Sequence, residues 1–164
     1  MIPQTLVFLL FSAITLGAGL AVVTSKNILH SAFYLILSFV GVAGLYVLLE
    51  APFLAVVQIL VYVGAIAVLI VFAIMLTRRL MSKDLIQQNA QWIWAGLGTL
   101  GLFAALAFIL FQVEWPTAAA SAPENQVNLL GEALVGPYLV PFEVASILLL
   151  IALVGSIIIA REEE

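Results

Sequence analysis

Five apolar stretches, each long enough to cross a lipid bilayer, constrain this chain more than any other feature. A membrane-spanning helix needs about 20 consecutive apolar residues, and no stretch carries a charged residue near its centre. A charge at the bilayer centre costs about 2.5–3.5 kcal/mol, whereas one Leu or Ile contributes only about 0.3–0.6 kcal/mol. The sequence therefore predicts an all-α integral membrane protein with five transmembrane helices in a single membrane domain. The predicted helices are residues 2–23, 28–49, 52–76, 92–113 and 140–160.

The low charge content supports the same prediction. Only 9% of the 164 residues are Asp, Glu, Lys or Arg, against about 25% in soluble domains. The chain could not cover a water-facing surface of its own size, and no basic cluster suggests nucleic acid. The first apolar stretch has no positive segment before it and is longer than the apolar part of a signal peptide. We interpret it as a retained transmembrane helix.

The charges between the stretches predict an orientation. All five basic residues fall on one side of the predicted bundle, and the connections on the other side hold only acids. Because basic residues are enriched on the cytoplasmic side, we expect an N-out, C-in protein of the bacterial plasma membrane. Residues 114–139 are then an external loop, with a short interfacial turn of helix around 129–134, and 161–164 are a solvated tail. The basic residues are Lys26, Arg78, Arg79, Lys83 and Arg161; the acids opposite are Glu50, Glu114, Glu124 and Glu132.

The chain has few residues that could hold a redox centre. It contains no cysteine and a single histidine, His30, which excludes thiolate metal sites and multi-histidine haem or zinc sites. We expect no catalytic residue, metal or cofactor in this chain. His30 is interpreted as a polar residue at headgroup level because no acidic partner is evident; the alternative is a proton-relay role.

The third stretch is the most unusual. Gln58 and Tyr62 are four residues apart, so both polar groups point from one face of a helix, and Gly64 follows. A glycine here is most simply a notch for close helix packing. The sharper alternative is a local irregularity such as a π-bulge, which often marks a functional site.

Other polar and small residues have plain structural explanations. Glu143 lies close after a proline, where a carboxylate favourably meets a helix N-terminus; the alternative is a proton pathway. Glu50 is interpreted as a solvated helix end. Seven glycines are interpreted as helix-packing notches: Gly17, Gly19, Gly41, Gly44, Gly96, Gly98 and Gly101.

Three segments resemble one known family. Residues 58–76 are similar to the third helix of chain 6 (subunit J) of the proton-pumping NADH–quinone oxidoreductase, respiratory complex I. Residues 138–161, with Pro141, Phe142 and Glu143, resemble its fifth helix, and Asn27 with His30 resembles the entrance of its second helix. The rest of the chain matches in hydropathy.

The resemblance implies a non-catalytic subunit of a proton-translocating complex, packed within a larger membrane arm. Its partners would be neighbouring small subunits, the quinone-site subunit and antiporter-like subunits. Flavin, iron–sulfur clusters and quinone would belong to partner subunits. In that family the third helix can carry a π-bulge, here near residues 62–68, whose conversion to regular helix is proposed to gate a water chain. Gln58, Tyr62, Gly64 and Val68 would then take part in gating and coupling, although Gln58, where some relatives have an acid, argues against proton carriage there.

Three other classes fit part of the pattern. A subunit of a cation/proton antiporter or of a membrane-bound hydrogenase would share the hydropathy. A small multidrug exporter would need a central membrane acid, which is not evident. A structural scaffold would tolerate substitutions at Gln58, Tyr62 and Gly64.

Overall fold

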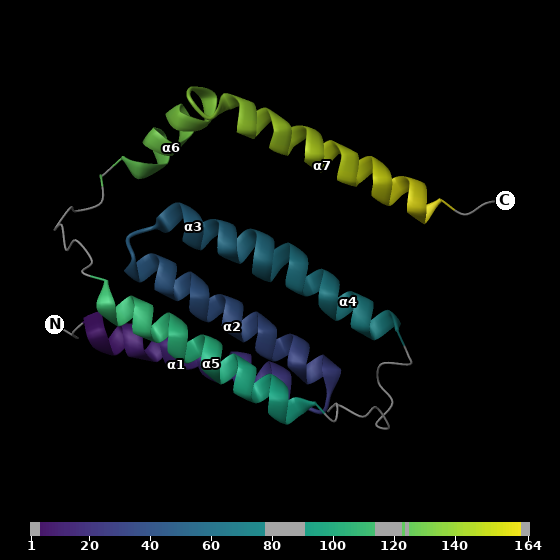
Figure 1. Ribbon diagram of the computed structural model, residues 1–164. Helices are drawn as coiled ribbons and strands as arrows, with labels where there is room; N and C mark the ends of the chain where they lie inside the picture. Colours follow the sequence, from purple (N-terminus) through teal and green to yellow (C-terminus); the bar gives the residue numbers. More distant parts are fainter. Residues whose placement is uncertain (1–3, 78–90, 114–122, 124, 162–164) are drawn as a thin grey trace. The chain divides into compact units, whose positions relative to one another are not determined.

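The computed structural model describes residues 4–77, 91–113, 123 and 125–161, and every regular element in this part of the chain is a helix (Figure 1). Five helices within it are long and apolar enough to cross a membrane. The prediction of an all-α protein with five membrane spans is thus confirmed. These spans are α1 (Gln4–Thr24), α2 (Ile28–Leu48), the third span Pro52–Leu76, α5 (Trp92–Gln112) and α7 (Leu139–Ala160).

The third span is one continuous rod made of three parts. It begins as α3 (Pro52–Val57), continues as the π-helical segment η1 (Gln58–Ala67) and ends as α4 (Val68–Leu76). A sixth, shorter helix, α6 (Gln126–Val135), precedes α7. The chain divides into two compact units, 1–118 and 119–164.

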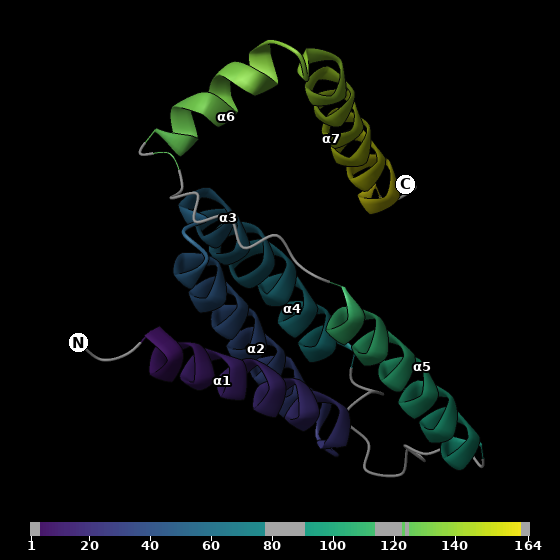
Figure 2. The ribbon, with the colours of Figure 1, turned by 60° about the vertical axis from the view of Figure 1, so that its left-hand side comes forward.

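In the first unit, α2 lies between α1 and the third span (Figures 1 and 2). Asn27 starts α2 as its N-cap: the side-chain oxygen Oδ1 accepts hydrogen bonds from the backbone N–H of Leu29 (3.0 Å) and of His30 (3.4 Å). His30 is exposed in the first turn, where a cap of this kind satisfies N–H groups that have no partner within the helix. The exposed position of His30 at the beginning of α2 agrees with the polar residue at headgroup level that the sequence predicted.

Small residues bring α1 and α2 into close contact. A Cβ atom added to Gly41 would fall on the Thr15 side chain and 3.1 Å from the Thr15 backbone nitrogen, and one on Gly44 would fall on the Phe11 ring. The Ser38 hydroxyl donates a hydrogen bond to the Thr15 carbonyl oxygen, 3.1 Å away. Small residues that let backbones approach, joined by hydrogen bonds between helices, are how helices associate in lipid. Gly41 and Gly44 are therefore the packing notches that the sequence predicted.

The turn after α2 reverses the chain into the third span. The N–H of Glu50 donates to the Val47 carbonyl (3.1 Å), and the N–H of Ala51 donates to the Tyr46 carbonyl (3.0 Å). This pair of bonds is the Schellman motif, which places the residue after the helix in the left-handed region, usually as glycine. Here that residue is Glu50, with φ 54°. Pro52 then opens α3 at a position where its missing N–H costs nothing.

The second unit consists of α6 and α7, joined at a bend over residues 136–138 (Figures 1 and 2). The predicted turn of helix around 129–134 is present and longer, filling 126–135. The rest of the predicted external loop, 114–122 and 124, lies outside the described residues. α7 starts at Leu139, so Pro141 is its third residue, where an N–H would have no intrahelical partner.

α5 and α7 bury none of their residues within the described part of the chain. A Cβ atom added to Gly17, Gly96, Gly98 or Gly101 would have no neighbour within 4 Å, and one on Gly19 would lie 3.9 Å from Ser38 Oγ. None of these five glycines is therefore a close packing notch against the described residues of its own unit. Apolar helices of this kind have to be covered by lipid or by other membrane-spanning helices.

Candidate functional site

The candidate site is the π-helical segment η1, in the middle of the third span. It covers ten residues, Gln58 to Ala67, whereas most π-helical elements are single turns inside α-helices. It includes three of the residues singled out from the sequence, Gln58, Tyr62 and Gly64; Val68 is the first residue after it. The π-helical irregularity, which the sequence analysis gave as the alternative to a packing notch, is thus present. It begins four residues before the expected range 62–68.

The π-helical segment sets which residues face α2. Four residues of the third span are buried: Ala55 (7% exposed), Gln58 (6%), Ala67 (1%) and Ile74 (9%), and α2 is the helix that packs on all three parts of the span. Gln58 and Ala67 are nine residues apart. In a regular α-helix nine residues make about two and a half turns, which would put these two side chains on opposite faces. Both can face α2 only because the helix is wound more loosely between them.

Gln58 is a polar side chain in an apolar contact. It is buried to 6% exposure between the third span and α2, and amides removed from water are stable only when their hydrogen-bonding groups find partners. Its amide can both donate and accept hydrogen bonds but does not titrate. This residue can therefore orient a water molecule, although it cannot carry a proton.

Tyr62 lies at the edge of the same contact. Its ring meets Phe39 of α2 edge to face, with ring centroids 5.5 Å apart and planes at 74°, and 43% of the residue remains exposed. This T-shaped geometry is favourable for aromatic pairs. The structure thus brings Gln58 and Tyr62 together on the side of the span that faces α2.

Gly64 and Val68 lie away from α2. Val68 is 57% exposed, and Gly64 is also exposed. A Cβ atom added to Gly64 would lie 3.4 Å from the Ile59 carbonyl oxygen of its own helix and near no described residue of another helix. Gly64 is therefore not a packing notch against the described residues. Of the four residues, Gln58 and Tyr62 face α2, while Gly64 and Val68 lie on an exposed side of the span.

Glu143 lies in the second unit, on α7. Its side chain is exposed, and its backbone carbonyl accepts a hydrogen bond of 2.7 Å from the Ser146 hydroxyl. Because α7 begins at Leu139, Glu143 is the fifth helical residue and not part of the first turn. The interpretation that Glu143 meets the helix N-terminus in the first turn is therefore wrong, because the helix begins two residues before Pro141.

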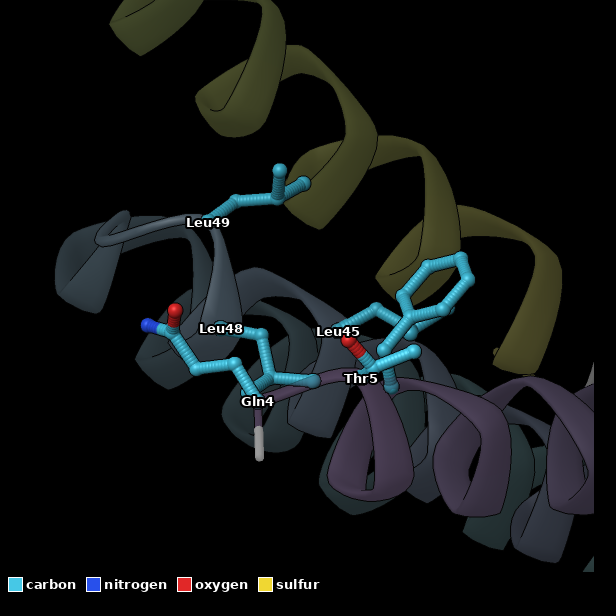
Figure 3. A pocket seen from close by; sticks show the side chains of 6 residues that line it. Gln4, Thr5, Leu45, Leu48 and Leu49 are labelled. Carbon is cyan, nitrogen blue, oxygen red and sulfur yellow. The ribbon is translucent and has the colours of Figure 1, made fainter. Parts of the chain in front are cut away.

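Among the described residues, neither a metal-binding cluster nor the groove at one end of the first unit involves the candidate site. No three His, Cys, Asp or Glu residues in the described part of the chain converge to hold a metal ion. A groove of about 370 Å³ lies between the beginning of α1 and the end of α2, and none of its lining residues belongs to the candidate site (Figure 3). It is lined by Gln4, Thr5, Phe8, Leu45, Leu48 and Leu49.

Sequence reasoning missed Phe39 and Ala67. Both lie in stretches that are apolar on all sides, so no alternation of polar and apolar residues indicates which side is buried. The nine-residue separation of Gln58 and Ala67 indicates loose winding only once it is known that both residues face α2.

Comparison with known proteins identifies the family. The family model of NADH-ubiquinone/plastoquinone oxidoreductase chain 6 matches residues 18–159. The NAD(P)H-quinone oxidoreductase chain 6 proteins of Leptolyngbya boryana and of Synechocystis sp. are each 40% identical to this chain over 98% of its length, covering 81% and 82% of those proteins. Subunit J of the F(420)H(2) dehydrogenase of Methanosarcina mazei is 39% identical, covering 98% of this chain and 92% of that protein. The chain therefore belongs to the NADH-ubiquinone/plastoquinone oxidoreductase chain 6 family and is a subunit of a multi-chain membrane oxidoreductase.

Proposed function

We propose that this chain is a membrane-arm subunit of a proton-translocating NAD(P)H:quinone oxidoreductase and couples quinone reduction to proton movement without binding a redox group itself. The similarity to chain 6 proteins along nearly the whole chain supports this assignment. Flavin, iron–sulfur clusters and quinone would be bound by partner subunits. The partners would be neighbouring small membrane subunits, the quinone-site subunit and antiporter-like subunits.

The electron donor is a separate question. Relatives of similar identity are named for NAD(P)H and for F(420)H(2), so the membrane subunit is compatible with different donors. Affinity purification of this chain from native membranes tests the assignment. A peripheral arm with flavin and iron–sulfur clusters should co-purify; a hydrogenase, or antiporter subunits without any redox arm, would support the alternative classes.

The third span acts as the gate in this proposal. The observation that carries it is the shared burial of Gln58 and Ala67 against α2, which requires the loosely wound segment between them. Converting the whole of η1 to regular α-helix would rotate α4 by about 180° relative to α3, because Ala67 would then lie about two and a half turns after Gln58. With α3 held in place, Ala65 and Leu69 would then replace Ala67 at the surface of α2.

Such a rotation would change the surroundings of one polar group in an apolar span. Gln58 lies buried at the contact with α2, and rewinding the helix that follows it would change which side chains line that contact. Water that enters there could be oriented by the amide, which does not itself hold a proton. The span would therefore gate protons by admitting or excluding water.

A two-residue deletion within 59–66 tests this gate. It leaves Gln58 and Ala67 seven residues apart, about two turns of α-helix, so the span should become regular α-helix with both residues still facing α2. The complex should assemble and still pass electrons to an artificial acceptor that bypasses the quinone, while proton pumping per electron falls severalfold. Replacing the same two residues by Ala is the matched control. Wild-type pumping by the deletion variant would refute the gate; if the variant does not assemble, Gly64→Val tests the same segment.

The N-out, C-in orientation is also part of the proposal. Lys26 and Arg161, which follow α1 and α7, would both lie at the cytoplasmic surface, while Arg78, Arg79 and Lys83 lie outside the described residues. A protease-cleavable tag at the C-terminus should be cut from the cytoplasmic side only. Cleavage from the opposite side would reverse the orientation.

A further inference from the structure

α6 has two chemically different faces. Val127, Leu130 and Leu134 follow the i, i+3, i+7 spacing of one helical face, and Ala133 lies beside them. Asn128 and Glu132 are four residues apart and share the other side. The helix is therefore amphipathic except at its two terminal residues: Gln126 falls on the apolar side and Val135, 69% exposed, falls beside Asn128.

The apolar face of α6 is directed toward the membrane span that follows. Leu130, Ala133 and Leu134 are half-buried, and α7 is the helix that packs on α6. Asn128 and Glu132 are exposed on the side away from this contact. Because α7 runs into the membrane from the bend at residues 136–138, the apolar face of α6 looks in the direction of the bilayer.

The length of α6 prevents it from crossing the membrane. Ten residues of helix are about 15 Å long, half the hydrocarbon thickness of about 30 Å. Full insertion would bring Glu132, Asn128 and the backbone groups of the helix ends, which have no partner within the helix, into hydrocarbon. Full exposure to water would leave Val127 (56% exposed) and Leu129 (50% exposed) uncovered beside the apolar face.

We propose that α6 lies in the plane of the membrane surface and binds the lipid interface through its apolar face. Val127, Leu129, Leu130 and Leu134 rest at the boundary of headgroups and acyl chains, and Asn128 and Glu132 face water. This is the position that amphipathic helices too polar to insert adopt. Two features favour lipid as the occupant: α6 continues directly into a membrane span, and Tyr138, 60% exposed at the bend, is of the residue type enriched at membrane surfaces. The helix thereby fixes the height at which α7 enters the bilayer.

Site-specific fluorescence tests this placement. The chain has no cysteine of its own, so single cysteines at Val127 or Leu129 (apolar side) and at Asn128 or Glu132 (polar side) can carry a bimane label in the assembled complex. The complex is reconstituted into phosphatidylcholine vesicles with or without lipids brominated near the headgroup. Labelling of companion subunits is measured on a complex with the unmodified chain and subtracted.

Brominated lipid should quench the label at Val127 about threefold more than the label at Glu132, and iodide in the water should show the reverse order. Strong iodide quenching at both positions would place α6 in water and refute the proposal. Weak quenching at Val127 and Leu129 by both agents would mean that another protein chain covers the face, and would refute it equally.

Discussion

The rings of Phe39 and Tyr62 meet edge to face, 5.5 Å apart, and join α2 to the π-helical part of the third span. Phe39 lies in the regular helix α2, whereas Tyr62 lies in the segment that would have to change its winding in the proposed gate. This contact therefore couples a fixed helix to a convertible one. Aromatic pairs of this geometry contribute about 0.5–1.5 kcal/mol beyond the burial of their surface.

The first prediction concerns this pair. Phe39→Leu and Tyr62→Leu should each lower proton pumping per electron, and the double variant should lose less than the sum of the two losses, because each single change already removes the shared contact. Tyr62→Phe keeps the ring and should pump almost normally. Pumping and quinone reduction are measured on vesicles holding the assembled complex. Strictly additive losses would show that the two rings do not act together.

The second prediction concerns Gly64. Gly64→Ala adds a Cβ at ordinary contact distance, 3.4 Å from the Ile59 carbonyl oxygen, so the π-helical segment should persist and pumping should remain near normal. Gly64→Val adds two further carbons beside the same turn and restricts χ1. It should lower pumping severalfold while assembly changes much less. The amount of assembled complex in native gels and the pumping rate are compared for both variants; equal pumping by Val and Ala would exclude a hinge role for Gly64.

Much of the fold could be predicted because lipid imposes simple rules. The third span, 52–76, could be placed from Pro52 at one end and the apolar run that follows, and Asn27 carries the side chain of a helix cap. Length and hydropathy therefore predict the membrane spans to within one or two residues where the structure describes them. The beginning of α7 differs by one residue, because a proline in the first turn does not stop a helix.

The site was less predictable because apolar helices do not indicate their buried face. Ala55, Gln58, Ala67 and Ile74 become the buried face only through the winding of η1, and three of the four resemble their exposed neighbours chemically. Gln58 was found because it is polar, and Gly64 because it is unusual within a span. Nothing in the sequence singles out Phe39, because its contact with Tyr62 is visible only in the packed structure.

The third prediction compares glycines within and outside a helix contact. Gly41→Val should disturb the contact of α1 with α2, since even a Cβ would meet Thr15, and overpacking of this kind costs about 1–3 kcal/mol. Gly98→Val meets no described residue of this chain and serves as the matched control. The assembled complex should be less abundant and melt at lower temperature with Gly41→Val than with Gly98→Val. The reverse order would show that α5 is the more tightly packed helix in the assembled complex.

The fourth prediction concerns Glu143, an exposed carboxylate on a membrane span. Carboxylates in such segments face a water-filled path or a polar partner, so we propose that Glu143 meets one of these in the complex. Glu143→Gln retains the shape and hydrogen bonding without the charge. If Glu143 is a proton carrier, Gln should abolish pumping as fully as Leu does; if it is an interface contact, Gln should support assembly and pumping while Leu lowers the amount of complex. Normal assembly and pumping with Leu would show that Glu143 has neither role.

The fifth prediction concerns the left-handed backbone at Glu50. Glu50→Gly and Glu50→Ile both remove the carboxylate and whatever it contacts, so their difference isolates the backbone conformation at φ 54°. Glycine adopts this conformation without a steric penalty, whereas other residues pay about 1–2 kcal/mol, and a β-branched side chain is especially unsuited to it. The complex with Glu50→Gly should therefore melt at a higher temperature than the complex with Glu50→Ile. Thermal unfolding followed by intrinsic fluorescence in detergent measures the difference, and equal melting temperatures would mean that the turn between α2 and α3 does not adopt the Schellman conformation in the assembled protein.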